Sequence, residues 1–221
     1  MDIRNYMLQK TNIPSYDDAF NAAINSFSKK TPDSMCEKAG AVYNEKTSTI
    51  ALTSLAKCLE VKYPAGEVVF KNTLEIPLLE WRLIAINYLA RATGTKPANE
   101  PVSFRQLEGG SLYYPAFEKR AIRPLVSLFD SSSMYDLKRV FEFYKGFFIE
   151  RSFGDFTVVF DFFPMLPIEI KYYKGDGEVP SNVSMHFDST ANQYLHTEDA
   201  AVAGELLILL LIQENKFLKS L

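Results

Sequence analysis

The sequence contains few of the residues from which metal and disulfide sites are built: two cysteines, two histidines and one tryptophan in 221 residues. Cys36 and Cys58 are too few for a disulfide framework, and without histidine they cannot complete a structural zinc site. The longest wholly apolar run is Leu206–Ile212, whereas a membrane span needs roughly 20 residues. Residues 1–10 mix charged and apolar side chains and lack a signal-peptide core. We therefore expect a cytoplasmic protein that does not enter a membrane.

Basic residues are not in excess, since 24 Lys and Arg face 27 Asp and Glu, for a net charge of −3. Nucleic-acid binding normally requires a dense basic face that neutralises phosphates, so we do not expect a nucleic-acid partner. The sequence also lacks a phosphate-binding Gly-x-x-x-x-Gly-Lys loop, a His-Glu-x-x-His motif, a Cys-x-x-Cys motif and a Gly-x-Ser-x-Gly elbow. These absences remove most support for the common NTPase, zinc-protease and hydrolase classes.

The chain is instead rich in aromatic residues, with 17 Phe and 12 Tyr, and 47% of it is apolar. A chain of this length and composition can bury a core without disulfides or metals, and much of that core must be ring packed against ring. We predict one domain over residues 1–221. It is divided into a helical segment at 1–40, strands at 41–71 and a third region at 75–217.

The spacing of apolar residues alternates between the periods of helices and strands. We expect helices at 15–30, from Thr31-Pro32 to Gly40, from Pro77 to Gly94, at 135–143 and at 197–217. We expect two or three antiparallel strands within 41–71 and further strands at 156–162, 168–173 and 183–187. Another helix should begin near Tyr114-Pro115 and kink or break at Pro124, after a polar connection at 95–110.

This order predicts an α+β fold, in which antiparallel sheets pack with helices, rather than a parallel βαβ sheet. The last helix is apolar on almost every side, which predicts a buried C-terminal helix. Trp81 lies on the broad apolar stripe of the 77–94 helix, and we assign it to the core.

A first candidate site lies around Arg105, Gly109 and Gly110. Two glycines ahead of a helix let backbone N–H groups face an anion, which a nearby arginine could hold with two hydrogen bonds. The alternative is an ordinary Gly-Gly turn, with Arg105 paired to a surface acid.

A second candidate site consists of Asp176, Glu178 and Asp188. The first two follow a predicted strand and the third ends the next one, so their oxygens could hold a hard cation if they converge. The alternative is a hairpin loop whose acids accept hydrogen bonds from its own backbone N–H groups.

A third group contains both histidines, His186 and His196, with Glu198 and Asp199. Two histidines and a carboxylate could form an open metal site if they converge, although their spacing does not require it. The simpler interpretation is that the 197–199 segment caps a helix and places acids in its first turn. On its strand, His186 faces the same side as Asp188.

Several short motifs resemble the prokaryotic family called domain of unknown function 3786, over about residues 75–215. They are Tyr88-Leu89, Ser103-Phe104-Arg105, Gly110, Phe163-Pro164-Met165-Leu166-Pro167, Lys174-Gly175-Asp176-Gly177-Glu178-Val179-Pro180, Phe187-Asp188 and Tyr194-Leu195-His196-Thr197-Glu198-Asp199. Residues 1–70 contribute little to the resemblance. The sequence departs from the family pattern at Met165, where arginine is usual, at Gly177-Glu178, where two acids are usual, and at His196, where proline is usual. The last departure weakens the metal hypothesis.

The resemblance implies no activity, because none is assigned to the family. Some members carry a cysteine-rich iron–sulfur segment like those of corrinoid proteins, which suggests anaerobic redox or one-carbon metabolism. This chain lacks that segment. The residues that match the family pattern and that we single out for ligand binding are Arg105, Asp176, Glu178, Asp188 and Asp199, together with Gly109 and Gly110.

Our leading hypothesis is a small-ligand-binding or accessory domain, in which Arg105 and the Gly109-Gly110 turn face an acidic rim. The alternative is a metal-dependent hydrolase or lyase with Asp176, Glu178 and Asp188 as cation ligands and His186 as a base. A third hypothesis is a scaffold that only oligomerises. The sequence leaves open whether the chain is an enzyme, and it does not identify a cofactor.

Overall fold

The computed structural model describes residues 3–10, 17–149 and 154–220. Helix α1 (Asp17–Ser28) and helix α2 (Pro32–Ala39) agree with the helices predicted at 15–30 and from Thr31-Pro32 to Gly40; residues 15 and 16 lie outside the described residues. Gly40 caps the C-terminal end of α2 and has φ 66°. A Cβ there would lie 2.8 Å from Cβ of Pro164. Glycine is therefore required at this position both by its backbone conformation and by the close approach of another segment.

The next segment forms a four-stranded antiparallel sheet in the order β1-β2-β3-β4, where two or three strands were predicted. Its strands are β1 (Val42–Asn44), β2 (Thr49–Ser54), β3 (Lys57–Lys62) and β4 (Glu67–Phe70). In β2 and β3 alternate residues are buried, among them Ile50, Leu52, Leu59 and Val61. This pattern is expected of strands with one face on the core.

Helix α3 (Leu79–Arg91) follows, and the prediction that Trp81 belongs to the core is confirmed, because this residue is fully buried. The indole Nε1–H of Trp81 donates to Oγ of Ser54 at 2.7 Å. The Ser54 hydroxyl in turn donates to the backbone oxygen of Phe162 at 2.8 Å. This chain of hydrogen bonds satisfies two buried polar groups and joins the first sheet to the second.

The second sheet is antiparallel throughout, with the order β5-β9-β8-β7-β6. The central strands β7 (Phe156–Phe163), β8 (Leu166–Tyr173) and β9 (Asn182–Asp188) were predicted. The edge strands β5 (Pro101–Ser103) and β6 (Phe147–Phe148) were not. Their shortness explains the omission, since two or three residues show no periodicity.

A helix that begins near Tyr114-Pro115 and kinks or breaks at Pro124 was predicted; the helix is present, but it begins at Gly110 and does not break at Pro124. Helix α4 (Gly110–Phe117) continues through a π-helical turn, η4 (Glu118–Ile122), into α5 (Arg123–Asp130). In the π turn the N–H of Arg123 donates to the oxygen of Glu118. The wider turn changes the backbone pairing just before Pro124, which has no N–H to donate, so the helical run passes the proline without ending.

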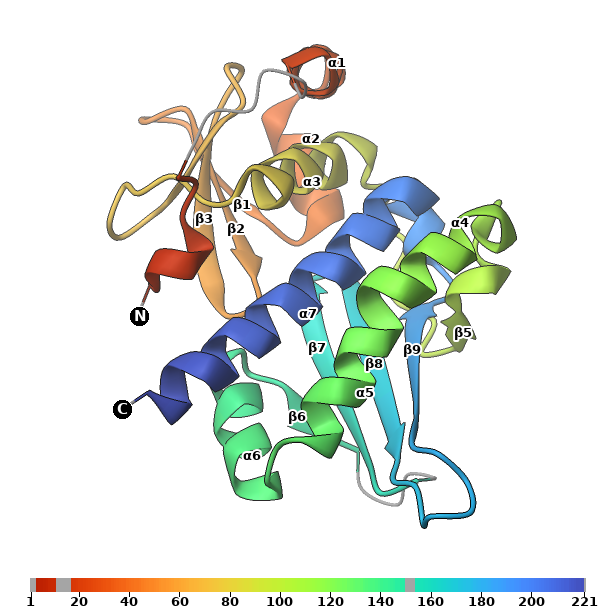
Figure 1. Cartoon of the computed structure of the whole chain (residues 1–221). Helices are drawn as coiled ribbons and strands as arrows, with labels where there is room; N and C mark the ends of the chain where they lie inside the picture. The colour runs from red at the N-terminus through yellow and green to blue at the C-terminus, as the bar shows by residue number, and fades with distance from the viewer. Residues whose placement is uncertain (1–2, 11–16, 150–153, 221) are drawn as a thin grey trace.

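Helix α6 (Met134–Phe143) is capped by Ser133, whose side chain accepts a hydrogen bond from the N–H of Asp136. The last helix is α7 (Thr197–Lys219), and the prediction that it is buried is confirmed. In Figure 1, α7 and the α4–α5 run lie side by side across one face of the second sheet. Gly204 permits this close packing, since a Cβ there would lie 2.8 Å from the ring of Phe117 and 3.0 Å from the sulfur of Met185.

Buried side chains from both sheets and from the helices form one contiguous cluster. The predicted α+β class is therefore confirmed. Among the described residues, no helix is both long enough and apolar enough to span a membrane.

Candidate functional site

The five-stranded sheet has a second face, which points away from the helices. In β9 the buried residues Val183, Met185 and Phe187 face the core. Ser184, His186 and Asp188 alternate with them and therefore point to the opposite face. There one row of directly opposed residues runs across all five strands, from Phe147 through Val159, Glu169 and His186 to Ser103.

This outer face is hollowed where the row meets the segment 97–101, and the hollow has a volume of about 290 Å³. Most of its wall is apolar and includes four prolines, which hold the backbone stiff. Polar groups converge from three strands and a loop. The lining residues are Pro97, Asn99, Pro101, Phe147, Ile149, Val159, Asp161, Pro164, Pro167, Glu169, His186, Phe187 and Asp188.

Glu169 contacts both His186 and Lys171 at the hollow. Its Oε1 lies 3.2 Å from Nδ1 of His186 and 3.0 Å from Nζ of Lys171. Burial, followed by the positive charge of Lys171, lowers the pKa of His186 below its ordinary value, and the charge of Glu169 only partly opposes this shift. The imidazole is therefore neutral at pH 7.

Asp188 also lines the hollow, and it holds the 97–100 segment in place. Its Oδ1 accepts hydrogen bonds from the backbone N–H of Ala98 and from the N–H and hydroxyl of Thr190, at 2.7–3.0 Å. Its Oδ2 accepts from the N–H of Glu100 at 3.3 Å. Burial alone would raise the pKa of Asp188, but these four bonds outweigh it and lower the pKa. The carboxylate of Asp188 is thus committed to the 97–100 segment.

Asp161 is different, because no side chain or N–H within the described ranges donates to its carboxylate. It lies on β7 opposite Pro167 and is a diagonal neighbour of Glu169 on the same face. The residue is exposed on this face, and the partial loss of hydration beside the wall of the hollow raises its pKa. Asp161 and Glu169 therefore offer carboxylate oxygens to the hollow from adjacent strands.

The structure places the Arg105 site elsewhere. The guanidinium of Arg105 stacks on the ring of Tyr114, with 3.8 Å between Cζ and the ring centroid, and the residue does not line the hollow. The N–H of Gly110 donates to the oxygen of Leu107 at 2.9 Å. A Cβ at Gly110 would lie 1.9 Å from the oxygen of Phe104, so this glycine permits close backbone packing. Gly109 has φ 70° and caps α4.

Asp176 and Glu178 do not meet Asp188, so the structure agrees with the alternative given for this site, a loop whose acid accepts hydrogen bonds from its own backbone N–H groups. Asp176 and Glu178 lie in the loop before β9, whereas Asp188 ends that seven-residue strand, so about 20 Å separates the two positions. Oδ1 of Asp176 accepts hydrogen bonds from the N–H groups of Val179 and Glu178, at 3.0 Å each, and these bonds lower its pKa. Within the described residues, no group of three or more His, Cys, Asp or Glu could hold a metal ion. The metal-dependent alternative is therefore not supported by the geometry.

The two histidines do not converge either. Nε2 of His196 lies 3.1 Å from Nη1 of Arg91 on α3, while His186 contacts Glu169. Asp199, the last of the predicted ligand-binding residues, accepts a hydrogen bond from Nδ2 of Asn87 at 3.1 Å, and burial raises its pKa. The first turn of α7 therefore fastens this helix to α3.

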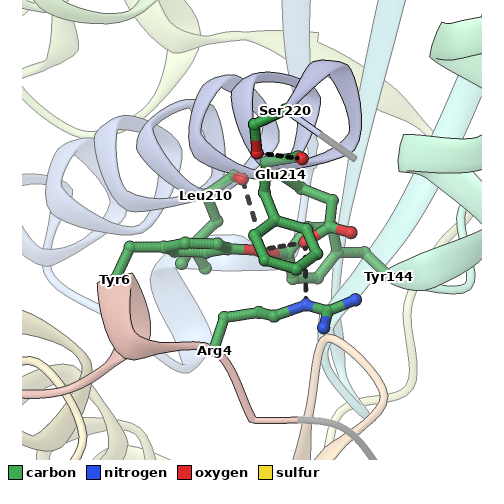
Figure 2. Close-up of polar contacts among 7 residues, drawn as sticks. Arg4, Tyr6, Tyr144, Leu210, Glu214 and Ser220 are labelled. Atoms are coloured by element: carbon green, nitrogen blue, oxygen red, sulfur yellow. Dashed lines mark hydrogen bonds and ion pairs between the residues drawn. The ribbon is translucent and has the colours of Figure 1, made fainter.

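A second polar cluster is buried between the N-terminal segment, α6 and α7 (Figure 2). Glu214 is fully buried, accepts a hydrogen bond from the Tyr6 hydroxyl and lies 3.4 Å from Nε of Arg4. The hydroxyls of Tyr6 and Tyr144 are 3.0 Å apart. Burial raises the pKa of both tyrosines. This cluster joins the two ends of the chain and is a structural feature that the sequence reasoning did not identify.

Of the residues singled out from the sequence, the hollow contains only His186 and Asp188. Glu169 and Asp161 were missed. A usable signal was present in the strand Ile168-Glu169-Ile170-Lys171-Tyr172, where an acid and a lysine occupy alternate positions between core residues. Such spacing places two opposite charges side by side on the outer face.

Comparison with protein families matches residues 31–209 to the model described as Domain of unknown function (DUF3786). The match begins well before residue 75, so the four-stranded sheet is part of the family pattern, which the sequence reasoning had placed outside it. No curated protein and no solved structure matches the chain.

Proposed function

The chain belongs to the DUF3786 family, whose description names no activity, and we propose from the geometry of the outer-face hollow that it binds a small molecule there. The observation that carries the proposal is the combination of stiff apolar walls with the carboxylates of Asp161 and Glu169, which line the hollow. Binding sites of small molecules are typically concave and mostly apolar, with a few convergent polar groups that fix orientation.

The size of the hollow limits the ligand. A volume of about 290 Å³ is at the lower end of the range of small-molecule sites, which begins at about 300 Å³. The apolar walls, including Phe147, Ile149 and Val159, suit a flat or compact hydrocarbon body. A ligand with one ring and one polar group fits this description.

The charges decide which polar group the ligand carries. The positive charge of Lys171 is paired with Glu169, and Lys171 does not line the hollow. Asp161 keeps a carboxylate without a protein donor, and the neutral His186 adds no positive charge at pH 7. An ammonium or another N–H donor is therefore favoured, while a carboxylate or phosphate would be repelled.

Three probes with the same ring test this preference: benzylamine, benzyl alcohol and benzoate. Each is titrated into isotopically labelled protein while the backbone NMR signals of residues 97–101, 159–169 and 186–188 are followed. We expect saturable shifts in these segments, with affinity in the order amine, alcohol, acid and a dissociation constant near the millimolar range. Binding of benzoate tighter than benzylamine, or shifts only outside these segments, would contradict the proposal.

Two matched variants assign the preference to one side chain. Asp161→Asn removes the unpaired carboxylate, and we expect the advantage of the amine over the alcohol to fall by about fivefold to tenfold. Asp176→Asn makes the same chemical change in the loop before β9, and the advantage should stay as in the wild type. A cytoplasmic location and a link to anaerobic redox or one-carbon metabolism remain predictions from the sequence.

A further inference from the structure

The two ring nitrogens of His186 have different surroundings. Nδ1 is buried and lies 3.2 Å from Oε1 of Glu169, although the two atoms lack the alignment of a good hydrogen bond. Hydrogen bonds of this kind are often poorly aligned before a ligand is bound. The ring lines the hollow, and no side chain or backbone group of the described segments is hydrogen-bonded to Nε2.

A carboxylate can only accept, so the proton of the neutral imidazole belongs on Nδ1 and the lone pair on Nε2. We infer that Glu169 and His186 form a proton-accepting dyad, in which Nε2 of His186 removes an acidic proton from a molecule bound in the hollow. His186 is the catalytic residue and Glu169 is a positioning residue that stabilises the imidazolium formed. The inference rests on the proposed function, since the molecule must first bind.

The groups around His186 fit a base that works near neutral pH. Glu169 and Lys171 face it from β8, Asp161 opens into the same hollow from β7, and Asp188 lies two residues along β9. Ser103 opposite it on β5 is uncharged. Because the pKa of His186 is lowered, the ring is already unprotonated at pH 7, while the negative charge of Glu169 favours the imidazolium once a proton has been taken.

A reporter reaction can test the dyad without knowledge of the natural ligand. In 5-nitrobenzisoxazole a base removes the proton on the ring carbon next to nitrogen. The electron pair of that C–H bond completes a nitrile, the N–O bond breaks and the oxygen leaves as a coloured phenolate. The step needs no oxidant, metal or co-reactant, and the base recovers when it loses its proton to water. The flat apolar probe matches the walls of the hollow.

We expect the full-length protein to accelerate this reaction by about tenfold or more over 4-methylimidazole at equal concentration. The rate should rise with pH, reach half its plateau below pH 6.5, the ordinary pKa of histidine, and then level. His186→Gln should remove the acceleration, and His196→Gln, which changes the only other histidine, should retain it.

Two further variants separate a positioning role from a structural one. Lys171→Met removes a positive charge beside the ring, so the half-plateau point should move to higher pH. Glu169→Gln removes the negative charge, so the point should move to lower pH and the plateau should fall by about tenfold. A merely structural Glu169 would lower stability without these opposite movements, and circular dichroism of each variant verifies that it is folded.

The outcomes distinguish the two proposals. If NMR shows the probe bound in the hollow but wild type and His186→Gln give equal rates, the dyad is refuted and ligand binding stands. If neither this probe nor benzylamine perturbs the hollow, the proposed function itself fails. Equal pH profiles for wild type, Lys171→Met and Glu169→Gln would also overturn the dyad, because the titrating group would lie elsewhere.

Discussion

Tyr6 and Glu214 are 208 positions apart in the sequence, yet the hydroxyl of one donates a hydrogen bond to the carboxylate of the other. Glu214 is fully buried on the last helix, and an uncompensated charge in that position would be costly. The contact therefore makes the N-terminal segment a required partner of α7. Figure 2 shows Arg4 and Tyr144 reaching the same carboxylate region from two other directions.

Tyr6→Phe should destabilise the fold by about 1.5–3 kcal/mol, because it removes a donor from a buried carboxylate while it keeps the ring. Tyr135→Phe makes the same change on α6, where the side chain is 70% exposed. That control should alter the free energy of unfolding by less than about 0.5 kcal/mol. Urea unfolding of the three proteins measures both values, and equal effects of the two substitutions would refute the role of the buried cluster.

The Gly109-Gly110 turn gives a second prediction. Gly110→Ala should cost about 3 kcal/mol or more, because the new Cβ would meet the oxygen of Phe104 at 1.9 Å and the backbone would have to move. At Gly109 a Cβ has no atom within 4 Å, but φ is 70°, so Gly109→Ala should cost only about 1–2 kcal/mol. Thermal melts compare the two, and a reversed order would show that the turn is not packed as described.

Substitutions at Asp188 and Asp176 distinguish a carboxylate that holds another segment in place from one that accepts hydrogen bonds only within its own loop. Asp188→Asn weakens four hydrogen bonds to the 97–100 segment and Thr190, and we expect a loss of about 2–3 kcal/mol. Amide hydrogen exchange at Ala98 and Glu100 should accelerate with it. Asp176→Asn in the exposed hairpin should leave both the free energy of unfolding and this exchange nearly unchanged. Equal behaviour of the variants would contradict the assignment.

His186 predicts a pH dependence of stability. Its pKa is lower in the folded protein than its ordinary value of 6.5, so between the two values the unfolded chain binds more protons than the folded one. Stability from this group is then complete above pH 6.5 and is lost as the pH falls toward the folded pKa. The free energy of unfolding of wild type minus that of His186→Gln should therefore decrease from about pH 8 to about pH 5. A constant or increasing difference would contradict the shifted pKa.

Sequence reasoning located most elements because their signals are local. Thr31-Pro32 and Gly40 marked the ends of α2, and strand periodicity marked β7, β8 and β9. The prediction failed where an element is defined by its contacts with another segment of the chain. Of the kink or break expected at Pro124, the break does not occur, because a π turn changes the pairing before it. Strands β5 and β6 are defined by their partners rather than by their own few residues.

The site was harder to predict, because it depends on which strands lie side by side. Asp176 and Asp188 are only 12 positions apart, but the strand between them carries them to opposite ends of the sheet. Glu169 and His186 are further apart in sequence and directly opposed in the fold. The order β5-β9-β8-β7-β6 brings the polar groups of the hollow together, and that order is set by tertiary packing that no local pattern contains.

A crystal structure of the full chain with benzylamine tests the central claim most directly. The account predicts the ring between Phe147, Val159 and the prolines of the hollow, with the ammonium within about 3 Å of a carboxylate oxygen of Asp161 or Glu169. Benzylamine bound at another surface, with the hollow open and Asp161 facing only water, would contradict it.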